Sequence, residues 1–341
     1  FLLCFILQHF VLDNFGVPFW LTVPSMVVLI WLYTRKGGIK TLVWTDTFQT
    51  LCMFAALLLI IYKVTGQLGM TPTEAIAAIS QDEHSRIFVF DDWVSRQNFW
   101  KQFLSGIFVV IVMTGLDQDM MQKNLTCKTL REAQKDMCSY GFAFVPANLL
   151  FLSLGVLLMM LAKSQVMALP EKPDDLLPMF AASGALGSMV TVFFTIGVVA
   201  ASFSSADSAL TALTTSVCVD IFGRDEDEDL RKKVHLAVAM VFMLFIIGFG
   251  ALNSTSVIDA IYILCSYTYG PLLGLFAFGL LTRRAVNDRL VPYVCLASPL
   301  LCYALDITAQ HLWGYRFGYE LLMINGAFTF AGLWATNSTK K

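Results

Sequence analysis

The chain has 341 residues, of which 57% are hydrophobic and 14% are charged, and its formal net charge is −2. Soluble domains carry about 45–50% apolar and about 25% charged residues, so this composition predicts an all-α polytopic membrane protein. The near-neutral charge and the scattered basic residues argue against a nucleic-acid partner. The 8 cysteines include no CxxC pair and the 4 histidines lie far apart, which predicts neither a disulfide framework nor a resident metal site.

Apolar runs of about 20 residues, the length that crosses a bilayer, follow one another along the chain. The full spans that we expect are 17–34, 42–63, 99–121, 138–161, 188–221, 234–252, 257–281, 290–311 and 320–334. Residues 1–12 are apolar but too short to span, and the chain has no initiator Met. We therefore expect the sequence to begin inside a helix that other helices precede. The long 188–221 span must tilt or protrude.

Two longer connections separate the spans. Residues 67–97 are polar, and Thr73 and Glu74 predict the start of a short amphipathic helix there. Residues 163–187 are rich in proline and aspartate and predict a loop. Lys and Arg gather in alternate connections, namely 35–40, 123–135, 224–233, 283–289 and the C-terminus. Positive charge marks the cytoplasmic side, which predicts a multi-pass plasma-membrane protein with a cytoplasmic C-terminus.

The 188–221 span carries a stripe of oxygen-bearing side chains. At helical spacing the following residues share one face: Ser204, Asp207, Ser208, Thr211 and Thr215. A carboxylate at membrane depth is costly and usually faces a bundle interior or an ion path, and small hard cations prefer oxygen ligands. Ser204, Ser205, Asp207 and Ser208 as a group therefore predict a cation site. The threonines, Thr214 included, could equally well bond the carbonyls of their own helix.

Three other polar clusters leave alternatives open. Asp46 lies near a span end, where pairing with Lys40 or capping of a helix is the simpler interpretation. Residues 114–119, which include Asp117, predict either a helix break that offers bare backbone to a ligand or an ordinary helix end. Tyr267 and Tyr269 precede a Gly-Pro pair that should kink their span, and their hydroxyls suit either a small polar solute or plain packing.

Three motifs follow one another along the chain, namely residues 37–49 (GGIKTLVWTDTFQ), 115–123 (GLDQDMMQK) and 204–208 (SSADS). They resemble, in the same order, the entry of the fifth core helix, the sixth core helix and the eighth core helix of the sodium/solute symporter family. That family includes sodium-coupled transporters of sugars, sialic acid, proline, iodide, monocarboxylates and vitamins.

The resemblance implies a leucine-transporter-type fold of two inverted five-helix repeats. On that basis residues 1–341 form a single transmembrane domain, in which 1–12 end a core helix, 17–281 are core helices four to ten, and 290–336 are two peripheral helices. The first core helices would be lacking, and with them half of the ion and solute sites. The fragment alone is therefore not expected to transport.

The resemblance also implies site residues. Sodium would bind the Ala201 carbonyl with Ser204 and Ser205, and a second cation would bind Asp46, Ser204, Asp207 and Ser208. Asp207 replaces the usual serine, which favours a second cation or a proton. Asp117 and Gln118 would contact the solute, to which we add Tyr267 and Tyr269 from the residue chemistry. Family members often have Asn at the Asp117 position, so the solute type stays open.

The expected function is sodium-coupled symport of a small organic solute across the lipid bilayer by alternating access. No cofactor is expected beyond the coupling sodium ion. The alternative is a membrane sensor or scaffold that keeps the transporter fold and binds solute without flux. A membrane enzyme is not expected, because the spans contain no nucleophile–histidine arrangement.

Overall fold

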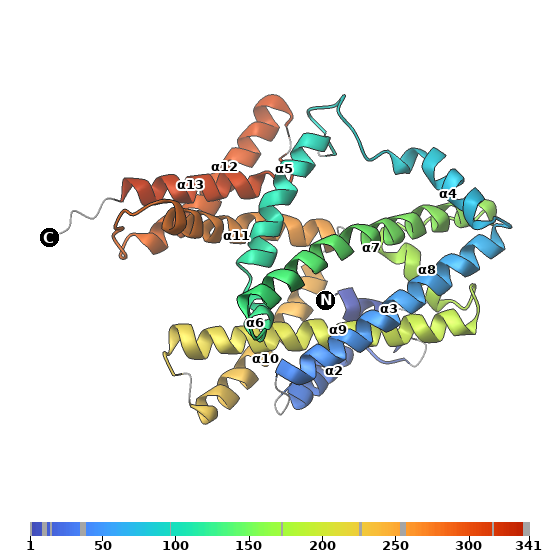
Figure 1. Cartoon of the computed structure of the whole chain (residues 1–341), viewed down its shortest axis with the longest axis horizontal. Coiled ribbons are helices and arrows are strands. Elements are labelled where there is room, and N and C mark those ends of the chain that lie inside the picture. The colour runs from blue at the N-terminus through green and yellow to red at the C-terminus, as the bar shows by residue number, and fades with distance from the viewer. Residues whose placement is uncertain are drawn as a thin grey trace. The chain divides into compact units, whose positions relative to one another are not determined.

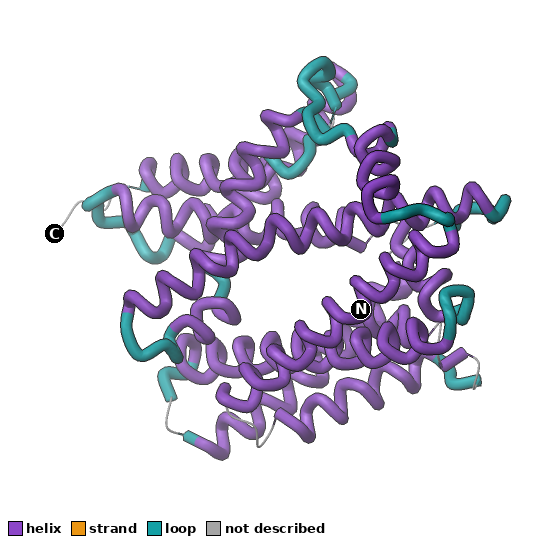
Figure 2. The backbone as a smooth tube through the Cα atoms, turned by 45° about the vertical axis from the view of Figure 1, so that its right-hand side comes forward, coloured by secondary structure: helices purple, strands orange, loops and turns teal. Residues whose placement is uncertain are grey.

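The computed structural model describes residues 2–8, 12–13, 16–34, 39–95, 97–171, 173–224, 227–252, 257–315 and 317–336. Within these ranges the chain is mostly helical and contains no strand (Figure 1, Figure 2). It divides into two compact units. Unit 1 is Phe1–Ser85 with Gln122–Ser256, and unit 2 is Arg86–Met121 with Val257–Lys341.

Unit 1 holds most of the helices. They are α1 (Leu2–Leu7), α2 (Phe19–Thr34), α3 (Ile39–Gln67), α4 (Pro72–Gln81), α7 (Leu130–Ser164), α8 (Leu176–Ala182), α9 (Ser188–Thr215) and α10 (Glu228–Leu252). Unit 2 holds α5 (Phe99–Val110), α11 (Val257–Leu281), α12 (Val291–Trp313) and α13 (Leu321–Ala335), while α6 (Gln118–Asn124) crosses the boundary in sequence. Two helices end in π-helical turns: α5 in Ile111–Gly115 and α9 in Ser216–Ile221.

Helices cover every expected span, and most ends are shifted by a few residues, although α7 and α10 begin eight and six residues earlier than expected. Among the described residues, six helices are long and apolar enough to cross a membrane, and the α5–α6 pair, bent by 60°, would be a seventh. The stretch Phe19–Leu32 and helix α13 are shorter apolar helices. The long central span is present from Ser188 to Ile221. These lengths and compositions are those of a multi-pass membrane protein.

Unit 1 packs around two apolar clusters. In the first, α3, α7, α8 and α9 bury Leu57, Leu157 and Phe180 against one another. In the second, α1, α2, α9 and α10 surround Val23 and Leu210. Helix α9 contributes to both clusters, and Figure 1 shows it lying along α3. The helix with the oxygen stripe therefore runs through the centre of unit 1, where apolar packing fixes its rotation.

Two connections contain more helix than the sequence indicated. The segment 163–187 is not wholly a loop, because α8 forms inside it and buries Phe180 completely. Proline and aspartate signalled a loop, whereas burial of a short apolar run against α3, α7 and α9 stabilises a helix. The amphipathic helix α4 begins at Pro72, with Thr71 as N-cap, two residues before Glu74. Thr71 and Glu74 form a capping box, which explains the earlier start.

Unit 2 is built on α11 and α13, which lie side by side (Figure 1). Gly270 and Gly274 face α13 so closely that a Cβ at either position would come within 2.5 Å of the α13 side chains Asn325 and Thr329. Small residues at such spacing let two membrane helices approach closely. A smaller apolar cluster of Val112, Leu273 and Leu322 holds the π turn after α5 against the same pair.

Candidate cation and solute sites

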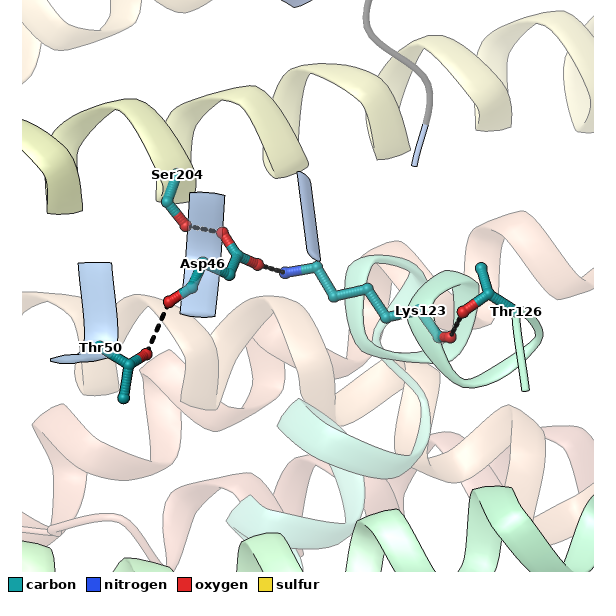
Figure 3. A network of polar contacts seen from close by, with 5 residues as sticks. All are labelled: Asp46, Thr50, Lys123, Thr126 and Ser204. Carbon is teal, nitrogen blue, oxygen red and sulfur yellow. Dashed lines mark hydrogen bonds and ion pairs between the residues drawn. The ribbon is translucent and has the colours of Figure 1, made fainter. Parts of the chain in front are cut away.

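Asp46 stands at the centre of a polar network in unit 1 (Figure 3). It lies well inside α3, which begins at Ile39, so it does not cap that helix. The Ser204 hydroxyl of α9 donates to Asp46 Oδ1, and Lys123 Nζ of α6 lies 3.3 Å from Asp46 Oδ2. The side chain of Lys40, the partner considered from the sequence, lies outside the described residues. The carboxylate therefore links three helices.

Helix α9 presents its oxygen stripe to the protein interior. Asp207, Ser208 and Ser204 are 0%, 3% and 8% exposed, whereas Ser205, the residue that follows Ser204, is exposed. Ala201, one turn earlier, is half-buried. The face predicted from helical spacing is thus buried at Ser204, Asp207 and Ser208. The structure brings Ser204 to Asp46 and places Ser205 on another side of the helix.

Ser208 is buried without a hydrogen-bond partner among the described residues. A buried hydroxyl without a partner costs free energy, so such groups are uncommon and usually have a reason. It follows Asp207 on the same buried face of α9 and lies one turn beyond Ser204. These oxygens, together with Asp46, form a set that a small hard cation could bind.

Thr214 and Thr215, farther along α9, bond elsewhere. Thr214 donates to Leu210 O at 2.7 Å and Thr215 donates to Thr211 O at 2.9 Å, so both bond their own helix. Thr214 Oγ1 also lies 3.0 Å from Nδ1 of His235. The alternative that these residues serve the helix backbone is therefore the arrangement observed for Thr214 and Thr215.

The predicted break at residues 114–119 is present in unit 2. Helix α5 ends in the π turn Ile111–Gly115, and α6 starts at Gln118 after a 60° bend. Asp117 lies in the gap, where its Oδ1 accepts from the Asp119 N–H at 2.9 Å and its Oδ2 accepts from the Tyr269 hydroxyl at 3.1 Å. Asp117 and Tyr269, two of the expected solute residues, thus meet in the structure.

The other two expected solute residues take no part in this contact. Gln118 is exposed, and no hydrogen bond of its side chain is seen among the described residues. Tyr267 packs its ring against Tyr303 of α12, with ring centroids 6.4 Å apart. Two residues along a helix correspond to about 200° of rotation, so Tyr267 and Tyr269 face opposite ways.

Three residues that the sequence analysis passed over have defined places in these networks. Lys123 appeared as a charge in a basic connection and as the last residue of the 115–123 motif, without an expected contact, yet it pairs with Asp46. His235 is buried between Thr34 Oγ1 (2.9 Å from its Nε2) and Thr214 Oγ1. Asn325 is fully buried in α13 and donates to two carbonyls of α11. A buried amide or imidazole in an apolar span is itself a signal, because its burial without partners is costly.

The model of the sodium:solute symporter family matches residues 8–290 of the chain. The chain belongs to this family. The membership expected from the three motifs is therefore confirmed, and the family consists of transporters rather than enzymes.

Relatives in the family include several sodium-coupled transporters. The chain is 24% identical over 278 residues to the sodium-dependent multivitamin transporter of Oryctolagus cuniculus, covering 78% of the chain and 43% of that protein. It is 30% identical over 122 residues to the sodium/iodide cotransporter of Homo sapiens, covering 35% of the chain and 18% of that protein. It is 24% identical over 296 residues to sodium-coupled monocarboxylate transporter 2 of Danio rerio, covering 78% of the chain and 44% of that protein.

A solved structure, the substrate-bound outward-open state of a Na⁺-coupled sialic acid symporter, matches the fold of the chain with a TM-score of 0.78. The match covers 98% of this chain and 69% of that chain at 18% sequence identity. The expected all-α, leucine-transporter-type fold is therefore confirmed. The chain spans less than half the length of the multivitamin and monocarboxylate transporters that it matches.

Proposed function

We propose that this chain is part of a sodium-coupled symporter that moves a small organic solute across the plasma membrane by alternating access. The observation that carries the proposal is the contact of Ser204 with Asp46, which places a buried hydroxyl of α9 on an acidic side chain of α3. Membership of the sodium:solute symporter family supports sodium as the coupling ion. The charge distribution supports a cytoplasmic C-terminus.

The ion sites belong to the same proposal. Sodium would bind the Ala201 carbonyl with Ser204 and Ser205, and a second cation would bind Asp46, Ser204, Asp207 and Ser208. Burial of Ser204, Asp207 and Ser208 supports the second set, since the oxygens point inward. Because Ser205 is exposed, the first sodium site would need further ligands from another helix that faces Ser205. Transporters of this fold often use carbonyls of a discontinuous helix for this purpose.

The solute would contact Asp117 and Tyr269, with Gln118 and Tyr267 as further candidates. The bend between α5 and α6 supports this choice, because a broken helix offers backbone groups that an intact helix does not. The Asp117 carboxylate accepts from the Tyr269 hydroxyl. The same carboxylate would accept hydrogen bonds from a polar solute. Relatives named for vitamins, iodide and monocarboxylates define the first solutes to test.

Coupling follows from differential binding. An ion that binds one conformation better than another shifts the population toward it, and the solute affinity changes by the same coupling free energy. Sodium bound on α9 would therefore favour the conformation that binds solute. A symporter in this sense requires that neither ligand crosses efficiently without the other.

The test is uptake into proteoliposomes that contain the full-length protein. Biotin, lactate and iodide are offered with an inward sodium gradient, and a potassium gradient of equal size serves as the control. We expect one of these solutes to be taken up, and only when the sodium gradient is present. We expect Ser204→Ala to raise the half-saturating sodium concentration of this uptake. Sodium-dependent binding without uptake would instead indicate a sensor, and sodium-independent uptake would contradict the proposed coupling.

A further inference from the structure

Helix α11 contains a proline beside the candidate solute residues. In an α-helix the carbonyl of residue i accepts from the N–H of residue i+4, and proline has no N–H to donate. Pro271 therefore leaves the carbonyl of Tyr267 without its helical donor. Helix α11 nevertheless continues through this position, from Val257 to Leu281. A carbonyl without a donor inside an apolar bundle is costly, so another group must satisfy it.

Asn325 of α13 supplies that donor. Its Nδ2 donates to Tyr267 O at 2.9 Å and to Ser266 O at 3.0 Å, so both amide hydrogens are used on α11. Its Oδ1 accepts from the Ser298 hydroxyl of α12, and the Thr329 hydroxyl donates to Ser298 Oγ at 2.8 Å. The whole side chain is 0% exposed. Every hydrogen-bonding group of this amide therefore has a partner.

The neighbouring glycines make room for this insertion. A Cβ on Gly270 would lie 2.2 Å from Asn325 Cγ and 2.3 Å from Asn325 Nδ2. Any side chain at position 270 would therefore expel the amide from α11. Gly270 directly precedes Pro271 in the sequence. Pro271 removes the backbone donor, and Gly270 leaves the space in which the Asn325 amide replaces it.

Two residues beyond the repaired carbonyl is Tyr269, whose hydroxyl donates to Asp117 at 3.1 Å. We propose that Asn325 is a positioning residue for the candidate solute site: it replaces the hydrogen bond lost at Pro271 and so holds the 266–269 turn in the orientation that presents Tyr269 to Asp117. This inference rests on the proposed function for the role of Tyr269. The repair of the helix itself does not.

The consequence of losing the amide follows from the geometry. Without Asn325 the Tyr267 carbonyl would have no donor, whereas the Ser266 carbonyl keeps the N–H of Gly270, and only a local rotation or opening of the turn offers Tyr267 water or another group. Either movement carries Tyr269 with it. Restoring a backbone N–H at position 271 would satisfy Tyr267 from within α11 and make the amide less necessary.

The experiment measures this turn directly in the purified full-length protein. Cys265 is half-buried and lies one helical turn before Tyr269, so its rate of alkylation by N-ethylmaleimide, followed by mass spectrometry of its peptide, reports opening of the turn. We expect Asn325→Ala to raise this rate by about tenfold, the effect of leaving one buried carbonyl, that of Tyr267, without a donor. The double variant Asn325→Ala/Pro271→Ala should return it to within about twofold of wild type.

Thr329→Val is the matched control. It removes the hydrogen bond to Ser298 from the same helix and keeps the side-chain volume, but it leaves both donations to α11 intact. A lower melting temperature with an unchanged Cys265 rate is expected for this variant. An equal rise in both variants, or a double variant as reactive as Asn325→Ala, would show that Asn325 only stabilises the bundle and would overturn the proposal.

The transport arm separates this inference from the proposed function. For whichever of biotin, lactate and iodide the wild-type protein takes up, Asn325→Ala should raise KM by about tenfold and change the half-saturating sodium concentration by less than about twofold. An added Tyr269→Phe change should then have little further effect on KM. Rescue of Cys265 protection together with uptake that does not depend on sodium would sustain the helix repair and contradict the proposed function. A solute KM unchanged by Asn325→Ala would contradict the positioning role.

Discussion

Lys123 and Asp46 form an ion pair, with Lys123 Nζ 3.3 Å from Asp46 Oδ2, at the carboxylate to which Ser204 donates (Figure 3). An ammonium and a metal cation compete when they approach the same carboxylate. We therefore expect Lys123→Met to strengthen sodium binding. The pair is partly exposed, and such pairs contribute about 1 kcal/mol, so the half-saturating sodium concentration should fall by about fivefold.

Sodium-dependent uptake or sodium titration of the purified protein would measure this change. Lys123→Arg keeps the charge and serves as the control, with little change expected. If Lys123→Met leaves the sodium dependence as it was, or weakens sodium binding, Lys123 is a supporting contact for Asp46 and not a competitor of the cation.

Ser208 separates ion binding from folding stability. Its hydroxyl is buried without a partner among the described residues, so Ser208→Ala should leave the melting temperature unchanged or raise it slightly. If the oxygen binds a cation, the same variant should raise the half-saturating sodium concentration by about tenfold, as expected for a lost ligand. Ser105→Ala is a matched control, because Ser105 is equally buried, also lacks a described partner and lies outside the candidate site. A Ser208→Ala protein with wild-type sodium dependence would remove Ser208 from the cation site.

Asp207 should determine the number of coupled ions. It is completely buried on the same face of α9 as Ser208. Asp207→Asn removes the charge and keeps the shape, so we expect a lower Hill slope for sodium in uptake assays and fewer charges moved per solute. Measurement of the reversal potential in proteoliposomes gives the stoichiometry. A stoichiometry identical to wild type would indicate that Asp207 is structural.

The Tyr269 hydroxyl should affect the solute KM more than the hydroxyl of Tyr303, whose ring packs on Tyr267. Tyr269→Phe removes the donor to Asp117, and hydrogen bonds to charged groups contribute about 1.5–3 kcal/mol, so the solute KM should rise about tenfold. Tyr303→Phe is the control, because the Tyr303 ring packs on Tyr267, which faces the side of α11 opposite to Tyr269. Equal effects of the two changes on KM would argue against a specific role for the Tyr269–Asp117 bond.

His235 should stabilise unit 1. Its two ring nitrogens lie 2.9 Å from Thr34 Oγ1 and 3.0 Å from Thr214 Oγ1, so it ties α2 and α9 to α10. His235→Phe keeps an aromatic ring but loses both bonds, which should lower the unfolding free energy by about 1–3 kcal/mol. A thermal melt measures the loss. In a Thr34→Val/Thr214→Val background the additional loss should be much smaller, and full additivity would show that these bonds contribute little.

The membrane-spanning helices were predictable from the sequence because the length of an apolar run is a strong and local signal. The start of α4 and the existence of α8 were harder to predict. The capping box of Thr71 with Glu74 could have been read directly, but α8 depends on burial of Phe180 against helices from distant parts of the chain. The break near Asp117 was one of two open alternatives, and only packing of the π turn against α11 decides between them.

The candidate site could be predicted as a face but not as a set of contacts. Helical spacing correctly placed Ser204, Asp207 and Ser208 on one buried side. The partner of Asp46 could not be found in the same way, because Lys123 is far along the chain and its type is common in loops. The opposite orientations of Tyr267 and Tyr269 can be predicted from their spacing alone, since side chains two positions apart on a helix point in nearly opposite directions.

The two helices at the end of the chain are more than an outer layer. Because Asn325 reaches from α13 into α11, a shortened protein that stops before α13 would expose an unmet carbonyl in the helix that carries Tyr269. Anyone designing a minimal version for crystallography or display should therefore keep the sequence through residue 335. Exchanging this segment between family members would also need Gly270 and its amide partner to be exchanged together.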